Sequence, residues 1–183
     1  MITTETDLSP ETAMRRVLEL FPSAQRALFQ RYHIGGCQSC GFDQGETLAQ
    51  LAARNGGLDV CEMIEHIRSS HERDQKLLIA PAELSRQRDL NPSLRLLDIR
   101  TREEFEAARI DGAVLFSQDL MQEILGHWPR QELIVIVDHA GKQGLDAAAY
   151  FVGHGFHDVR ALRGGIDAWS QEVDDNVPRY RLG

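Results

Sequence analysis

The stretch from Glu132 to Phe151, ELIVIVDHAGKQGLDAAAYF, constrains the fold more than any other part of the chain. Its residues 133–137 form an unbroken apolar run rich in β-branched side chains, which is typical of a strand buried on both faces of a parallel sheet. A short loop with two glycines follows over residues 138–144, and an alanine-rich segment then predicts a helix over 145–152. A strand, a tight loop and a helix in this order point backbone N–H groups and a helix N-terminus at the loop, a geometry that suits an anion.

Predicted strands and helices alternate through the C-terminal half of the chain. Thr101 and Glu104 form a capping box that predicts a helix start. Trp169, on the last predicted helix, is expected in the hydrophobic core. The alternation predicts an α/β domain, a parallel sheet with helices on both faces, whose ligand crevice lies at the carboxyl ends of the strands, where Asp138 stands. The strands are expected over residues 76–79, 94–98, 113–116, 132–137 and 158–162.

The N-terminal part predicts a small all-α domain of short helices. Ser9 and Pro10 have the types expected at an N-cap and a first helical position. Further helices are expected over residues 23–32 and 47–53, and after Asp59. The chain is therefore predicted to hold two domains, 1–73 and 74–183.

Composition and charge exclude several classes of function. The chain has 183 residues, of which 42% are hydrophobic and 26% charged, and its formal net charge is −8. An acidic chain of this kind is a poor match for nucleic acid or for an anionic membrane surface. The first residues are acidic and polar, and no run reaches the length of a membrane span, so a cytoplasmic protein is expected. Its cysteines are then expected to be reduced thiols, metal ligands or redox groups and not structural disulfides.

The spacing Cys37-x-x-Cys40, in a glycine-rich loop, lets two sulfurs converge on one metal or join as a disulfide. An iron–sulfur cluster and zinc are the candidate cofactors. Cys61 and His33 would complete a four-ligand set if the fold brought them together. For Cys61 we expect a small buried side chain on a helix instead, and for His33 a loop or cap residue.

The central stretch resembles the active-site region of the rhodanese family of sulfurtransferases, where a loop C-x-x-G-x-R-S follows the strand. Aligned on Gly141, Asp138 takes the position of the catalytic cysteine. Gln143 and Gly144 take those of the arginine and serine. Sulfur transfer in this family needs a thiolate that becomes a persulfide, and a carboxylate cannot carry sulfane sulfur. The resemblance therefore implies the rhodanese-like fold without its sulfurtransferase activity.

Two flanking segments extend the resemblance over nearly all of the C-terminal half. LLDIRTREEFEAARIDGAV is similar to the family's D-x-R-x-x-x-E-(F/Y)…G-H-I-x-G-A segment, with Ala108 and Arg109 in place of Gly-His. LRGGIDAWSQEVDDNVPRY resembles the C-terminal signature of single-domain rhodaneses and of those fused to sulfur-carrier activating enzymes. Asp98 and Arg100 are expected to form a structural pair beside the loop. Residues 15–68 resemble the N-terminal domain of iron–sulfur-centre repair proteins.

The loop is the candidate anion-binding site, although its first residue is itself an anion. We hypothesise that the Asp138 carboxylate occupies the ring of loop amides from within. His139 and Lys142 are expected to be exposed, solvated side chains. The complete loop consists of Asp138, His139, Ala140, Gly141, Lys142, Gln143 and Gly144.

Three functions compete. The first is a catalytically inactive rhodanese-like protein that acts as a binding or regulatory module in sulfur or iron–sulfur metabolism. Its partner would be a sulfur-carrier or iron–sulfur assembly protein, and a homodimer is a candidate assembly. The second is a sulfurtransferase or thiol redox enzyme that uses Cys37 and Cys40 in place of the missing cysteine. The third, hydrolysis with Asp138 as nucleophile or base, lacks the second carboxylate and metal that such chemistry usually needs.

Overall fold

The computed structural model describes residues 7–35 and 41–180. The chain divides into two compact units, Met1–Gln75 and Lys76–Gly183, and each is described by itself. The division falls near the C-terminal end of the longest helix, α4 (Val60–Lys76). We call the two parts the helical unit and the sheet unit.

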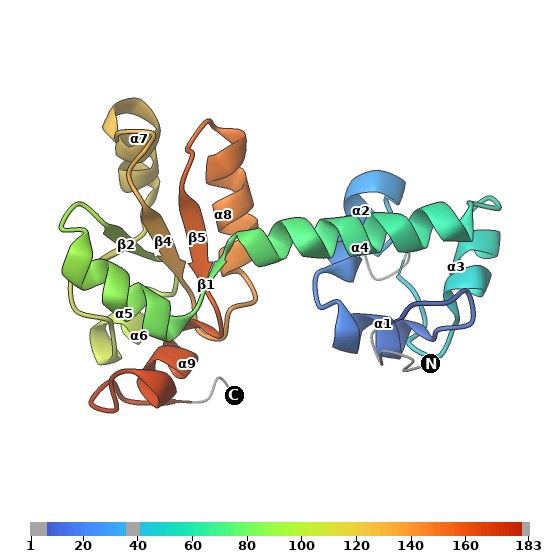
Figure 1. Cartoon of the computed structure of the whole chain (residues 1–183), viewed down its shortest axis with the longest axis horizontal. Coiled ribbons are helices and arrows are strands. Elements are labelled where there is room, and N and C mark those ends of the chain that lie inside the picture. Colours follow the sequence, from blue (N-terminus) through green and yellow to red (C-terminus); the bar gives the residue numbers. More distant parts are fainter. Residues whose placement is uncertain (1–6, 36–40, 181–183) are drawn as a thin grey trace. The chain divides into compact units, whose positions relative to one another are not determined.

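The sheet unit is built on five parallel strands in the order β1-β5-β4-β2-β3. Figure 1 shows β4 between β2 and β5. The central strand β4 pairs with β2 from Ile134 opposite Arg95 to Val137 opposite Asp98. All five strands lie within or close to the expected ranges, and the parallel sheet predicted from the alternating pattern is confirmed. The strands are β1 (Leu78–Ile79), β2 (Arg95–Asp98), β3 (Ala113–Leu115), β4 (Ile134–Val137) and β5 (Val159–Leu162).

The apolar run that led to the fold prediction supplies both faces of the sheet. Ile134 and Ile136 belong to one buried cluster, whereas Val135 and Val137 belong to another. All four side chains are fully buried, because successive side chains of a strand point to opposite faces. The central strand is therefore covered on both sides, as its continuous apolar sequence predicts.

Buried side chains of four helices pack on the two faces: α5 (Pro81–Leu90), α7 (Gln118–His127), α8 (Gly144–Gly153) and α9 (Gly165–Glu172). The cluster on one face includes Leu84 of α5 together with Trp169 of α9, and the cluster on the other includes Ile124 of α7 together with Phe151 of α8. Helices therefore pack on both faces, as predicted. A further helix of this unit, α6 (Arg102–Ala107), has no buried residue.

The helical unit has a buried core of its own, and every described residue of that core comes from this unit. Its largest helix, α4, buries Met63, Ile64 and Ile67 on one face. No helix in the described part of the chain has both the length and the apolar character needed to cross a membrane. The other helices are α1 (Met14–Leu20), α2 (Ala24–Tyr32) and α3 (Leu48–Arg54).

The expected helix start at Ser9 is wrong. Helix α1 begins at Met14, and Ala13 before it is extended and pairs with Thr47 in an isolated antiparallel bridge. The N–H of Met14 donates to the carbonyl of Glu46 at 2.9 Å, so a contact distant in sequence holds the start of this helix. The Ser9 side chain caps no helix and instead contacts Thr12 across a turn.

Candidate functional site

The site lies between the carboxyl ends of β4 and β2, two adjacent parallel strands. From β4 the chain continues to β5 on one side of the sheet order, and from β2 it continues to β3 on the other. Connections that leave in opposite directions open a crevice between the two strand ends, the usual ligand position in such folds. A cavity of about 550 Å³ lies there, lined by Ile99, Arg100, Thr101, Glu104, Asp138, His139, Ala140, Lys142 and Gln143.

The Asp138 carboxylate fills the centre of the loop. Its Oδ1 accepts a hydrogen bond from the N–H of Gly141 at 2.6 Å. Its Oδ2 accepts from the N–H groups of Gln143 and Gly144 at 2.7 and 3.1 Å. Asp138 is only 3% exposed, and Gly144 is the first residue of α8. The carboxylate therefore lies inside the amide ring at the start of a helix, where the sequence predicted it, and not in solvent.

A second helix start holds the loop from the other side. The N–H groups of Ile166 and Asp167, in the first turn of α9, donate to the carbonyls of Asp138 and His139 at 2.9 and 3.1 Å. Gly165 lies against the same carbonyls, with φ +61°, and a Cβ there would come within 2.5 Å of the Asp138 oxygen. Glycine is needed here because both the positive φ and the close backbone approach exclude a side chain.

Asp98 and Arg100 form a buried ion pair beside the cavity. Arg100 Nη2 lies 2.6 Å from Asp98 Oδ2, and the two side chains are 2% and 0% exposed. The guanidinium also donates to the Ala108 carbonyl and to the Tyr180 hydroxyl, both at 2.7 Å. Burial acts to lower the pKa of Arg100, but hydrogen bonds to Asp98 and Tyr180 outweigh burial and raise it. The structural pair expected from the sequence is confirmed.

Tyr180 contacts three residues of the cavity lining, Arg100, Glu104 and His139, and no role was expected for it from the sequence. Its hydroxyl donates to Glu104 Oε1 at 2.8 Å, and its ring lies 4.6 Å from that of His139. Burial raises the pKa of Tyr180. Burial also acts to raise the pKa of Glu104, but hydrogen bonds from Thr101 and Tyr180 lower it. The segment VPRY, within the family-like C-terminal signature, was the signal that could have identified this tyrosine.

The expectation that His139 is an exposed loop residue is wrong. The imidazole is half-buried because the Tyr180 ring covers it. Its Nδ1 is a buried atom with no hydrogen-bond partner among the described residues. Lys142, by contrast, is exposed as expected, and Ala140 and Gln143 are also exposed where they line the cavity.

The cysteines contribute nothing to this cavity within the described part of the chain. Cys37 and Cys40 lie outside the described residues, so their expected proximity and ligands stay predictions. Cys61 is a free thiol, and the expectation that it is buried is wrong. It is exposed because α4 turns the face with Met63 and Ile64 toward the core. Across residues 7–35 and 41–180, no group of three or more His, Cys, Asp or Glu side chains is arranged to hold a metal.

Comparison with known proteins gives the family. The model of the rhodanese-like domain matches residues 80–172. Thiosulfate sulfurtransferase GlpE of Shewanella oneidensis is 32% identical over 79 residues, which are 43% of this chain and 78% of that protein. The probable adenylyltransferase/sulfurtransferase MoeZ of Mycobacterium tuberculosis is 32% identical over 104 residues, or 56% of this chain. The adenylyltransferase and sulfurtransferase UBA4 of Candida albicans is 29% identical over 93 residues, or 46% of this chain.

The matches to MoeZ and UBA4 cover only 26% and 21% of those longer proteins. Among solved structures, reduced CoADR-RHD of Bacillus anthracis aligns with 68% of this chain and 22% of its own, at 18% identity and a TM-score of 0.50. That likeness concerns the fold alone. The family model spans half of the chain and covers the strands from β2 to β5 together with the loop, so the protein belongs to the rhodanese-like domain family.

Proposed function

We propose that the sheet unit is a rhodanese-like module without sulfurtransferase activity, and that the chain is a binding or regulatory protein of sulfur or iron–sulfur metabolism. Relatives named as sulfurtransferases support the metabolic context. The observation that carries the proposal is the Asp138 carboxylate, which accepts three loop N–H groups at the position of the cysteine in the family pattern.

In this proposal, the carboxylate of Asp138 cannot carry out the chemistry of the cysteine that it replaces. A thiolate attacks the outer sulfur of thiosulfate, a new S–S bond to the protein forms as the donor's S–S bond breaks, and sulfite leaves with the bonding electrons. A carboxylate oxygen gives no persulfide. In addition, the amides of Gly141, Gln143 and Gly144 already bind Asp138 and offer little stabilisation to an incoming anion.

In this proposal the helical unit supplies the reactive groups that the sheet unit has lost. Cys37 and Cys40 carry a metal, sulfur or redox equivalents, and the sheet unit docks a sulfur-carrier or iron–sulfur assembly protein. Support comes from the occurrence of a rhodanese-like domain and a C-x-x-C loop on one chain.

The test is the transfer of sulfur from thiosulfate to cyanide by the full-length chain. We expect the wild-type chain to form no thiocyanate above the protein-free rate. The variant Asp138→Cys, with a thiolate amid the same amides, is expected to gain one sulfur atom from thiosulfate, measured by intact mass, whereas Asp138→Ser gains none. The serine variant is the matched control, because it has a small polar side chain without thiol chemistry.

Two results would contradict the proposal in different ways. Wild-type turnover that disappears in Asp138→Ala would mean that the loop itself is catalytic. Wild-type turnover that disappears in Cys37→Ser would instead establish the second candidate, a sulfurtransferase or thiol redox enzyme that uses the N-terminal thiols.

A further inference from the structure

We propose that the cavity beside the Asp138 loop accepts a cation that carries N–H donors, namely the ammonium or guanidinium end of a lysine or arginine side chain of a partner protein. The inference rests on the proposed function, since an active sulfurtransferase would have to bind an anion in the same place. It names the chemistry by which this cavity recognises its partner.

The first reason is that the donors for an anion are already bound. Three loop amides donate to Asp138, so an anion that enters the cavity meets a carboxylate where these N–H groups would otherwise bind it. The family pattern has an arginine in this loop, and the chain has the uncharged Gln143 there. Both differences lower the affinity of the cavity for anions.

The second reason is the charge of the cavity wall. Glu104 and Asp138 each contribute a carboxylate, and hydrogen bonds from Thr101 and Tyr180 keep the pKa of Glu104 low, so it is ionised at neutral pH. The Arg100 guanidinium lines the same wall, but it is bound to Asp98 and is 2% exposed. Lys142 is the other cation of the lining, on the exposed rim, and solvent screens its charge more than it screens the carboxylates in the wall.

The third reason is an unused hydrogen-bond acceptor. The Nδ1 atom of His139 is buried and has no partner among the described residues. When the proton is on Nε2, Nδ1 is an acceptor, and a buried acceptor without a donor costs free energy. Thr101 and Gln143 line the same cavity, and their side chains carry a hydroxyl and an amide oxygen that can accept hydrogen bonds. A ligand with several N–H groups can donate to Thr101 and Gln143 from the cavity, and to Nδ1 of His139 once the ring turns toward it, whereas an oxyanion offers no donor to any of them.

The experiment is an NMR titration of the ¹⁵N-labelled full-length chain with three probes. We expect n-butylammonium to shift the backbone amide of Gln143 and the ring nitrogens of His139. Tetramethylammonium has the same charge but no N–H donor, and it should bind more weakly. Sulfate should leave these signals unchanged. Sulfate binding at His139 and Gln143 without butylammonium binding would overturn the inference, while the sulfur-transfer assay would be unaffected.

Two variants test the preference of the cavity for a cation over an anion: Asp138→Ala should reverse it, and Glu104→Gln should weaken it. In Asp138→Ala the loop amides become free, so sulfate should bind and the affinity for butylammonium should fall by about tenfold. Glu104→Gln keeps the hydrogen-bonding shape of the side chain but removes its charge, and about tenfold weaker butylammonium binding is expected there too. Equal butylammonium affinity in the wild type and in Glu104→Gln would contradict the inference.

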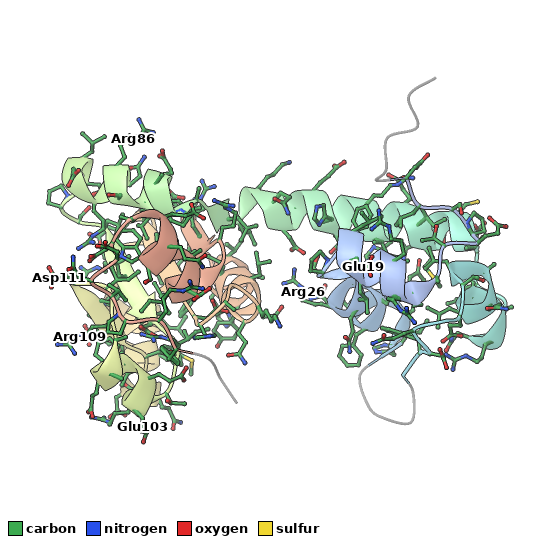
Figure 2. The ribbon with its side chains drawn as sticks, turned by 90° about the horizontal axis from the view of Figure 1, so that it is seen from below. Glu19, Arg26, Arg86, Glu103, Arg109 and Asp111 are labelled. Carbon is green, nitrogen blue, oxygen red and sulfur yellow. The ribbon has the colours of Figure 1, made fainter. Side chains whose placement is uncertain are left out.

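The matched control is Glu103→Gln on the same helix. Glu103 is exposed, does not line the cavity, and extends away from the ribbon in Figure 2. The Glu103→Gln variant should leave butylammonium binding unchanged, which separates a local contact from the general acidity of the chain.

A short lysine-containing peptide should bind more tightly than butylammonium, as expected for a protein partner. Equal affinities would instead favour a free amine and overturn the assignment to a protein side chain.

Discussion

At the scale of single residues, Asp138 has two effects. It satisfies three amides that would otherwise lack partners, and it places a negative charge at the start of α8. An amide that is buried without a partner costs about 1–3 kcal/mol. Asp138 therefore stabilises the loop that it occupies, whether or not the loop binds anything else.

Asp138→Ala should lower the free energy of unfolding of the sheet unit by roughly 0.5–2 kcal/mol, as for the loss of a helix cap. Sulfate should recover part of this loss in the variant and stabilise the wild type less, because a ligand stabilises the folded state that it binds. Urea denaturation with and without sulfate, at matched ionic strength, measures both effects. The control is Asp59→Ala, which removes a carboxylate that caps the start of α4, bonded to the N–H groups of Cys61 and Glu62. A sulfate effect of equal size in both variants would contradict the amide-ring interpretation.

Glu104 should make stability depend on pH in the acid range. Its pKa is lowered in the folded chain, so its contribution is fully present above the unfolded value of about 4.3 and disappears as the pH falls through the lower folded value. The difference in unfolding free energy between the wild type and Glu104→Gln should therefore shrink as the pH falls below about 4.3. Denaturant titrations of both proteins across this range provide the measurement. A difference that grows toward acid pH would show that the sign is wrong.

At the scale of elements, the loop is held between the starts of two helices. Helix α8 begins at the carboxylate of Asp138, and α9 donates from its first turn to the carbonyls of Asp138 and His139. The turn before α9 allows this contact only because Gly164 and Gly165 have positive φ and no side chains. The site therefore depends on the junction between β5 and α9 as well as on the loop itself.

Gly165→Ala should destabilise the sheet unit far more than Gly155→Ala. Both glycines have positive φ, +61° and +86°, where alanine costs about 1–2 kcal/mol. The added Cβ at 165 would also lie 2.5 Å from the Asp138 oxygen, whereas at 155 it meets no atom within 4 Å. Thermal unfolding of the two variants measures the difference. Equal losses would mean that the close approach to the loop carries no energetic weight.

The elements also show which sequence signals could be trusted. The strand β4 was predictable because its apolar run is continuous, and the start of α6 because Thr101 and Glu104 form both bonds of a capping box. The start of α1 was not predictable from Ser9 and Pro10, since the bridge between Ala13 and Thr47 joins segments that no local pattern connects. Local signals failed where a contact distant in sequence determined the backbone conformation.

At the scale of the whole chain, the two units bring different chemistry. The sheet unit holds the cavity and its carboxylates. The sequence of the helical unit contains all three cysteines. Asp138 was predictable because a motif fixes its place relative to Gly141. Tyr180 was not, because it reaches Arg100 and Glu104 from 80 and 76 positions away, a separation that only the folded chain closes.

The proposed division of labour predicts a specific pattern among cysteine variants. The full-length chain, purified without oxygen, should contain a thiophilic metal or two thiols that oxidise together. Cys37→Ser and Cys40→Ser should each lose this property, because two sulfurs are needed. Cys61→Ser is the matched control, since Cys61 is exposed on α4, and it should keep the property. Metal analysis and thiol titration measure the outcome, and equal effects of all three variants would contradict the pairing.

The three bonds from the loop to Asp138 have a consequence for the exchange of amide hydrogens with solvent. The N–H groups of Gly141 and Gln143 belong to a loop at the edge of a cavity, where rapid exchange with heavy water is the usual expectation. Because a buried carboxylate accepts them, they should exchange slowly in the wild type and much faster in Asp138→Ala. Slow exchange in an apparently open loop would thus be a direct signature of the side chain that occupies it.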